Sequence, residues 1–525
     1  MTVQASEQTP LLEDPKHPPS SGTCCKVLTN SCCATIDHVK KPPYCQLSDQ
    51  SWENKCVALL CVLFLAAGSH FAAHTLGAMK NTIKQEFGIS NSQYGVLQSS
   101  VAIVNTILPV LGGIFIDVFG TVPGSICATA LITSGNVMVA LSTHSANWNM
   151  MIVGRVLYGI GSGSVVIVQE TILSQWFRGK SLAVVVALML TVSRLASFLA
   201  QATVMPIARW SGWYGYGFWF SAALCFFSLV INLFYITLLR KVSPVSNVDH
   251  CKNIQAIKQK KTFHWHKLLY LPHAYWLVVV MEFLLGGGWG CFLHVNSEFV
   301  KYRFGYDDSR AAAIASVAQI LPIFFMPLLG VFVDRYGKRS VLSKSSQAVT
   351  GSGFTFTFAI YLLNYTILHP LIGMLLFSVS LALGPVGLVS SVPILLPLSF
   401  VGTGLGLVKC ATNIGAALFD IGTGWLQDQD IDKGYSGVMV CFLAIGGLST
   451  LFGCVLWILD RHLYDGLLDQ STASAQRRGK MATKKQDAMA DRPLKMNYLY
   501  GAILFGLMAT SWTLFVRIII HQWLY

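Results

Sequence analysis

The sequence predicts an all-α membrane protein with two sets of six membrane-spanning helices and one extra C-terminal transmembrane helix. Three observations support this fold class: the composition, the length and spacing of the apolar stretches, and a loop motif that occurs twice. Of the 525 residues, 53% are hydrophobic and only 12% are charged, and the mean hydropathy is +0.55. Soluble domains carry about 25% charged residues. The composition therefore excludes an ordinary soluble enzyme and indicates a chain that lies in a lipid bilayer.

Twelve apolar stretches are long enough to cross a bilayer, which takes about 20 helical residues. The first six cover approximately 56–79, 93–116, 122–142, 149–174, 181–205 and 217–239. After a polar, basic loop, six more cover approximately 273–297, 311–333, 341–363, 369–393, 402–426 and 436–459. We therefore expect a six-helix bundle over 56–239, a cytosolic basic loop over 240–272 and a second six-helix bundle over 273–460.

The two ends of the chain lie outside these bundles. Residues 1–55 are polar and punctuated by proline, without the apolar core of a cleavable signal peptide. Residues 461–496 form a polar linker to a further apolar stretch, for which we expect a thirteenth helix over 497–520. Lysine and arginine are concentrated in the tails and in the loops on one side of the bilayer, which predicts a cytosolic N-terminus. The same placement assigns the net charge of +13 to loops that face anionic lipid rather than to nucleic-acid binding.

A basic loop motif follows the eighth apolar stretch and has a weaker copy in the first half. It reads Gly330-Val-Phe-Val-Asp334-Arg335-Tyr-Gly337-Lys338-Arg339, and the earlier copy, Gly113-Ile-Phe-Ile-Asp117-Val-Phe-Gly120, lacks the cations. Both segments resemble the conserved loops between helices 2 and 3 and between helices 8 and 9 of the major facilitator superfamily. The resemblance implies the twelve-helix fold of that superfamily, a 6+6 pseudo-repeat, in which these loops latch the cytoplasmic gate. The residues that carry this assignment are Gly113, Asp117, Gly330, Asp334, Arg335, Gly337 and Arg339.

Ionisable residues inside the apolar stretches are candidates for function, because a charge in hydrocarbon costs roughly 3 kcal/mol. They occur in stretches 1, 4, 5, 7 and 11, and stretches 3, 6, 9 and 12 have none away from their ends. In the superfamily these last four helices support the outside of the bundle and the others line a central cavity. The residues concerned are His70, His74, Arg155, Glu170, Arg194, Glu282, His294, Lys409 and Asp420.

Arg194 is the sharpest candidate, because a guanidinium deep in a membrane span can bind a carboxylate through two hydrogen bonds. The alternative is an ion pair with Glu170 or Glu282 that only holds the bundle together. Lys409 either holds an anion or pairs with Glu282. Glu282 itself either carries a proton, binds an amine or forms a plain ion pair. For Arg155, at the start of a glycine-rich segment, we expect a structural or a coupling role.

The other candidates carry similar alternatives. His74 and His294 are either proton carriers or neutral, hydrogen-bonded histidines. The glycine run from Gly286 to Gly290 contains Trp289 and is either a hinge or a packing surface. With Trp289 and Asn413, which follows Lys409 by one helical turn, the candidate substrate-binding set is Arg194, Lys409, Glu282, Glu170, His74, Trp289 and Asn413.

Several stretches resemble the lysosomal dipeptide transporters within the superfamily. They are Gly68-Ser69-His70-Phe71, the segment Gln169–Lys180, Ser193-Arg194 and Lys301-Tyr-Arg-Phe304-Gly305. The resemblance implies that Arg194 takes the carboxylate of a dipeptide. Two positions depart from the pattern, because an expected acidic residue is Gly163 and an expected aspartate is His74. Either Glu170 and Glu282 replace them, or the solute is an organic anion without an amine.

The N-terminal tail contains Glu7-Gln-Thr-Pro-Leu11-Leu12, which resembles an acidic dileucine sorting signal for lysosomes or vacuoles. We therefore expect a secondary-active or facilitative transporter of dipeptides or amino acids in a lysosomal or vacuolar membrane. The alternatives are a monocarboxylate or organic-anion transporter and a transporter-like solute sensor. The expected partners are the solute, the bilayer, sorting adaptors and a membrane partner subunit, with no nucleic acid. No phosphate loop, metal-ligand spacing or nucleophile elbow is present, so we expect no enzyme activity, cofactor or metal.

Overall fold

The computed structural model describes residues 47, 50–108, 120–177, 181–242, 271–336, 345–396, 401–430, 434–463 and 496–524, and every regular element in them is helical. Eleven helices or helix runs within these residues are long and apolar enough to cross a membrane. The predicted sorting signal (Glu7, Leu11 and Leu12) and the motif residues Gly113, Asp117, Gly337 and Arg339 lie outside them. Helix α14 includes Gly330, Asp334 and Arg335, but their side chains are not among those described.

The N-terminal half, which we define as residues 52–242, contains six apolar segments. The first is a run of two helices, and the second is described only at its beginning. The elements are α1 (Trp52–Leu65), α2 (Ala67–Ala78), α3 (Lys80–Phe87), α4 (Asn91–Val104), α6 (Thr121–Ser145), α7 (Trp148–Trp176), α8 (Ser181–Ser211) and α9 (Gly215–Val242). A capping box starts α4, in which Ser90 and Gln93 satisfy each other's backbone amides.

The C-terminal half, residues 273–463, repeats this plan. Its first segment contains a π-helical turn that begins at Glu282, and π-turns are frequent at functional sites. The elements are α11 (His273–Met281), η3 (Glu282–Gly286), α12 (Gly287–Phe304), α13 (Asp308–Ser316), η4 (Val317–Gln319), α14 (Ile320–Tyr336), α16 (Ser345–Tyr365), α17 (Pro370–Leu395), α18 (Val401–Gln429) and α19 (Ser436–Leu463). With α21 (Met496–Leu524), these elements confirm the predicted fold class of twelve helices and an extra one.

The glycine run in the seventh segment lies against α18. A Cβ atom on Gly287 would lie 2.6 Å from the carbonyl carbon of Gly415, and one on Gly415 would lie 2.1 Å from the carbonyl oxygen of Phe283. Two backbones that approach this closely tolerate only glycine. The geometry therefore favours the packing alternative for this run over the hinge.

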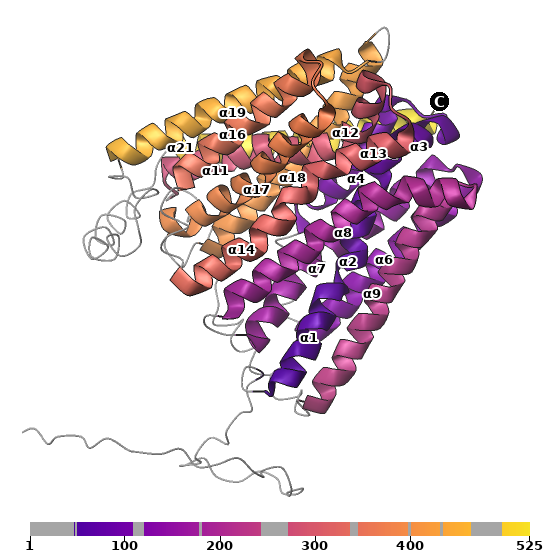
Figure 1. The fold of residues 1–525 in the computed structure, drawn as a ribbon. Helices are drawn as coiled ribbons and strands as arrows, with labels where there is room; N and C mark the ends of the chain where they lie inside the picture. Colours follow the sequence, from indigo (N-terminus) through magenta and orange to yellow (C-terminus); the bar gives the residue numbers. More distant parts are fainter. Residues whose placement is uncertain are drawn as a thin grey trace, which may run out of the picture. The chain divides into compact units, whose positions relative to one another are not determined.

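The two halves meet along a seam in which α4 packs on α18, α8 packs on α13 and α14, and α2 packs on α12 (Figure 1). Two glycines bring α4 and α18 into backbone contact. A Cβ on Gly95 would lie 2.3 Å from the carbonyl oxygen of Asp420, and one on Gly424 would lie 2.3 Å from that of Asn91. These contacts lie toward the end of the seam that carries α3, which we call the α3 end.

The extra helix α21 contacts both halves. Asn497 donates a hydrogen bond to the carbonyl oxygen of Leu271, just before α11, at 2.8 Å. Near the other end of α21, Trp512 donates to Thr106 Oγ1, just after α4, at 3.1 Å. Helix α21 also packs on α18. It therefore lies along the seam and braces both halves.

We expect Trp512→Ala to lower the melting temperature of the purified protein by about 2–4 °C. The change removes one hydrogen bond and part of the indole packing, together about 1–2 kcal/mol. The matched control is Phe505→Ala on the same helix, whose side chain is largely exposed. Thermal unfolding in detergent measures both, and equal melting temperatures would mean that α21 does not brace the seam.

Candidate functional site

The α3 end of the seam is closed by a buried ionic cluster. Lys80 and Lys84 of α3 each place the ammonium nitrogen 2.8 Å from a different carboxylate oxygen of Glu298, on α12. The side chains of Glu298 and Lys80 are 0% and 2% exposed. Tyr435 donates to Glu298, and Lys80 also donates to Gln427 at 2.8 Å. We call these five residues the gate cluster, because the lysines belong to one half and the other members to the other half.

A second contact across the same end caps α4 from the opposite half. Asp428 of α18 accepts hydrogen bonds from the backbone amides of Asn91 and Ser92 at 3.0 and 2.7 Å, and from both side chains. The first amides of a helix have no partner within it and carry partial positive charge, so a carboxylate stabilises them. Asp428 therefore holds the start of α4 against α18.

An exposed ion pair lies at the same end. Arg209 of α8 lies 2.7 Å from Asp307, which precedes α13. Slight desolvation would raise the pKa of Asp307, but the hydrogen bond and charge of Arg209 outweigh it and hold that pKa below its ordinary value. Because a lowered carboxylate pKa keeps the group ionised as the pH falls, this contact persists in a mildly acidic compartment.

Deeper in the N-terminal half lies a group of basic side chains. Arg194 is half-buried, and its charge acts on His70 and His74, both on α2. In the part of the chain that the structure describes, its guanidinium has no ion-pair or hydrogen-bond partner. The predicted alternative of an ion pair with Glu170 or Glu282 is therefore not formed in this conformation. A half-buried guanidinium without a partner is suited to bind an anion.

Arg155 differs from Arg194 in being buried. It donates to Gln98 of α4 at 2.8 Å, and its guanidinium lies 5.7 Å from the ring centre of Tyr158. Its described hydrogen-bond partner is thus a neutral amide. Asp420, in the opposite half, acts on Arg155 electrostatically without direct contact. Both contacts of Arg155 lie within the N-terminal half, and only the charge of Asp420 relates it to the other half, so the structural and the coupling roles both stay open.

The acidic side chains predicted for the site lie near Lys409. The lysine on α18 acts electrostatically on Glu170 of α7 and on Glu282 of η3. Glu282 is buried and accepts a hydrogen bond from Thr412 at 2.9 Å. Lys409 and Glu170 are exposed although they lie in apolar helices. The three charges thus link the two halves without direct ion pairs.

The remaining predicted residues are placed differently. Trp289 is buried and donates from Nε1 to Ser380 Oγ of α17 at 2.9 Å, which favours packing within the C-terminal half. Asn413 donates to the carbonyl oxygen of Lys409, one turn earlier on the same helix. Gly163 stands where the family resemblance leads us to expect an acidic residue. A Cβ atom there would lie 2.0 Å from Oδ1 of Asn105. That buried oxygen has no described hydrogen-bond partner, so an amide occupies the space where an acidic side chain was expected.

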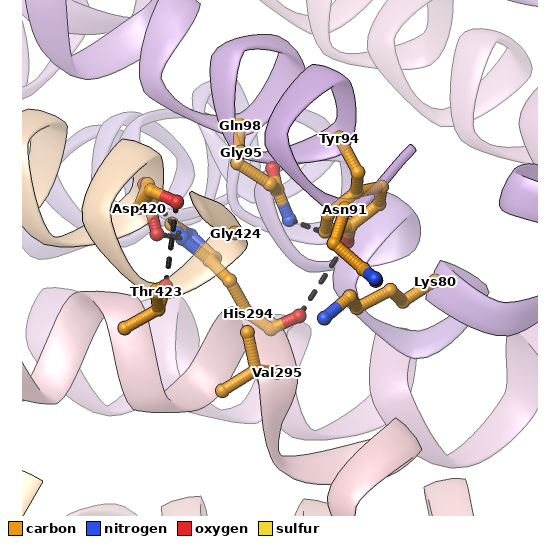
Figure 2. Close-up of a pocket in the computed structure, with 10 residues that line it drawn as sticks. All are labelled: Lys80, Asn91, Tyr94, Gly95, Gln98, His294, Val295, Asp420, Thr423 and Gly424. Carbon is orange, nitrogen blue, oxygen red and sulfur yellow. Dashed lines mark hydrogen bonds and ion pairs between the residues drawn. The ribbon is translucent and has the colours of Figure 1, made fainter. Parts of the chain in front are cut away.

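A histidine–aspartate pair lies beside a small cavity that is lined by residues of both halves (Figure 2). His294 Nδ1 lies 3.0 and 3.1 Å from the two carboxylate oxygens of Asp420. The cavity beside them has a volume of about 10 Å³, about the space of one water molecule. Its wall combines the pair with residues of the other half, including Lys80, Asn91 and Tyr94.

Sequence reasoning missed the gate cluster. Lys80 lies one residue beyond the predicted stretch 56–79, and Glu298 lies one residue beyond 273–297. Both therefore read as solvated loop charges. The helices continue past these limits, to Phe87 through a helical kink and to Phe304 directly, and bring both charges into the seam. Opposite charges just past the ends of two apolar stretches are the signal that was available.

Comparisons with known proteins agree with this geometry. The family model of the Major Facilitator Superfamily matches residues 59–420. The chain is similar to the lysosomal dipeptide transporter MFSD1 of Danio rerio, at 26% identity over 81% of this chain and 91% of that protein. The protein of that name from Homo sapiens is 26% identical over 78% of this chain and 87% of its own length. Among solved structures, the peptide transporter POT in complex with sulfate has a TM-score of 0.59 at 16% identity, covering 78% of this chain and 95% of that one.

Proposed function

Because the chain belongs to the major facilitator superfamily, we propose that it moves dipeptides or amino acids across a lysosomal or vacuolar membrane by alternating access. The N-terminus would be cytosolic and the α3 end would face the lumen. The loops around Asp117 and Asp334 would latch the opposite end. Sorting adaptors that read the N-terminal tail, and a membrane partner subunit, belong to the same proposal.

The observation that carries the proposal is the half-buried guanidinium of Arg194, which has no ion-pair partner among the described residues. A solute carboxylate would accept two charge-assisted hydrogen bonds from this guanidinium. Glu170 and Glu282, held near Lys409, would meet the ammonium group. The unpartnered oxygen of Asn105 is a further, uncharged acceptor for it. Arg194 in the N-terminal half and Glu282 in the C-terminal half suit a zwitterion that bridges the two halves.

Two observations outside the site support the transport proposal, one on the class of solute and one on the mechanism. The relatives reported above are named lysosomal dipeptide transporters, and they align with about four-fifths of the chain. The gate cluster closes one end of the seam, as alternating access requires of one end at a time. The closed end is the α3 end, which in this proposal would face the lumen.

We expect Arg194→Gln to reduce uptake of labelled alanyl-alanine into proteoliposomes by at least about tenfold, because the charge-assisted hydrogen bonds to the carboxylate are lost. The matched control is Arg240→Gln, an exposed arginine at the end of α9, for which uptake stays at the wild-type rate. Equal uptake by both variants would remove Arg194 from the site.

The same assay separates the organic-anion alternative, which is favoured by His74 and Gly163 at positions where acidic residues were expected. Labelled lactate is the probe for it. Uptake of lactate without uptake of alanyl-alanine would replace the dipeptide proposal. Binding of either solute without any flux would instead indicate a solute sensor.

A further inference from the structure

The Asn105 amide is a buried polar group whose oxygen has no hydrogen-bond partner among the described residues. Asn105 is 9% exposed, and a Cβ atom on Gly163 of α7 would lie 2.0 Å from its Oδ1. A buried oxygen that stays unpaired destabilises a protein, because it has lost its hydrogen bonds to water. The amide would therefore be stabilised by a donor that enters beside Gly163, such as the ammonium group of a solute.

Asn105 lies at the depth of the proposed carboxylate-binding residue. Helices α4 and α7 begin at the α3 end, and α8 ends there. At 1.5 Å per residue, Asn105 lies about 21 Å, Gly163 about 22 Å and Arg194 about 26 Å from that end of their helices. A small solute whose carboxylate is bound at Arg194 would thus have its ammonium group in the same layer of the bilayer as the Asn105 amide.

The extra helix α21 holds the backbone directly after Asn105. Trp512 Nε1 donates to Thr106 Oγ1 at 3.1 Å, and the same hydroxyl donates to the carbonyl oxygen of Ile103 at 2.7 Å. Thr106 is 1% exposed. Helix α4 ends here in a tight turn, in which the amides of Thr106 and Ile107 bond to carbonyl oxygens three residues earlier rather than four. Because backbone dihedral angles restrict side-chain rotamers, this turn sets the direction of the Asn105 amide.

We propose that α21 sets the solute selectivity of the site: Trp512 acts through Thr106 to position the Asn105 amide, whose oxygen accepts a hydrogen bond from the ammonium group of the solute. The proposal deepens the transport function proposed above and rests on it. Asn105 touches the solute, whereas Trp512 and Thr106 are positioning residues. Since α21 lies outside the two six-helix bundles, control over the site would come from the additional helix.

The contribution of Asn105 is separate from that of the acidic side chains. An ammonium group has three N–H donors, so it can bond to the Asn105 oxygen while it also meets Glu282 and Glu170. The amide is neutral and contributes only when its oxygen points at the donor, whereas the attraction of a carboxylate acts over a longer range. Amine recognition by Asn105 therefore depends on the turn that Trp512 and Thr106 hold.

Two solutes isolate the amine. Propionyl-alanine is alanyl-alanine with a hydrogen atom in place of the amino group, so it keeps the carboxylate for Arg194 and has no ammonium for Asn105. We define the amine preference as kcat/KM for uptake of labelled alanyl-alanine into proteoliposomes divided by that for labelled propionyl-alanine. Loss of general packing would reduce both rates and leave this ratio unchanged. A change of the ratio therefore reports on amine recognition.

We expect Asn105→Leu to lower the amine preference by about tenfold, because one hydrogen bond to a charged group is lost. Trp512→Phe removes the indole N–H and keeps a ring, and Thr106→Val removes the hydroxyl and keeps the shape. Each should lower the preference by at least about threefold, with uptake of propionyl-alanine within about twofold of the wild type. The two variants break the same contact from opposite sides, so the test does not depend on the folding of one of them.

Matched controls make the same chemical changes away from the turn. Trp210→Phe alters an indole on α8 that is 92% exposed. Thr513→Val alters an exposed hydroxyl that bonds within α21, next to Trp512. Both should keep the wild-type preference.

A double variant tests whether Trp512 acts through Asn105. In the Asn105→Leu background, Trp512→Phe should lower the amine preference no further, because effects that pass through one group are not additive. Additive effects, or a wild-type preference in both Trp512→Phe and Thr106→Val, would overturn the positioning role. Equal uptake of the two solutes by the wild type would overturn amine recognition and leave carboxylate transport intact. Uptake of neither solute by the wild type would overturn the transport function, and the selectivity proposal with it.

Discussion

Glu298→Gln should open the α3 end of the protein and shift the balance between its closed and open states by at least about a hundredfold. The substitution leaves Lys80 and Lys84 facing a neutral amide in a buried site. Removing one partner of a buried ion pair costs about 3–5 kcal/mol, because the remaining charge keeps its desolvation penalty. Separation of the seam at this end would hydrate the two lysines and remove that penalty without unfolding the helices.

Hydrogen exchange measures this opening without added labels. We expect the closed seam to protect the backbone amides of residues 80–95, including those of Asn91 and Ser92, which donate to Asp428. We expect their exchange to accelerate in Glu298→Gln and uptake to fall in parallel. Replacing Glu298, Lys80 and Lys84 together with methionine should restore protection, because no buried charge remains.

The ion pair between Lys301 and Asp308 provides the control for this experiment. Its side chains are 25% and 29% exposed, and both lie in the C-terminal half. Exposed pairs contribute about 0–1 kcal/mol. Asp308→Asn should therefore leave exchange of residues 80–95 unchanged. If Glu298→Gln behaves like Asp308→Asn, the gate cluster does not hold the seam closed.

The fold could be predicted from the sequence because the bilayer fixes the length of each apolar stretch. Even α16, the ninth segment, has its predicted place although it is rich in glycine, serine and threonine. Arg194, Lys409 and Glu282 could be selected as candidate site residues for a related reason, since a charge in an apolar helix is costly. These inferences depend only on local sequence.

The contacts that close the seam could not be predicted in this way. Glu298 meets Lys80 across 218 residues of chain (298 − 80), and His294 meets Asp420 across 126. Such pairs depend on how two helix bundles pack, which no local pattern encodes. The same holds for Trp289, which stays a predicted site residue: its indole donates a hydrogen bond to Ser380 of α17, a contact that the glycine run around it does not encode.

The gate cluster and the central charges are connected through the same two helices. Helix α12 carries both His294 and Glu298, one turn apart, and α18 carries Lys409, Asp420 and Asp428. A movement of α18 away from α4 would therefore release the cap on α4, open the cavity beside Asp420 and displace Lys409 together. Close contact between these two helices is the condition for the closed state.

Gly424→Ala tests that condition directly and should destabilise the closed state by about 1–3 kcal/mol, a shift of about fivefold to 150-fold toward opening at the α3 end. The added Cβ would lie 2.3 Å from the carbonyl oxygen of Asn91, a backbone atom that can move only with α4. Alanine is a better helix former than glycine, so the loss cannot come from a weaker α18. Exchange of residues 80–95 should accelerate and uptake should fall.

Gly422→Ala is the matched control, because it makes the same chemical change two residues earlier on α18, where a Cβ would meet nothing within 4 Å. It should leave exchange and uptake at wild-type values. Faster exchange in both variants would point to a general effect of glycine on α18. Wild-type behaviour in both would show that α4 and α18 do not need backbone contact to close. Faster exchange in Gly424→Ala alone would establish that the seam closes through this contact, on which the sealing of the cavity beside His294 and Asp420 also depends.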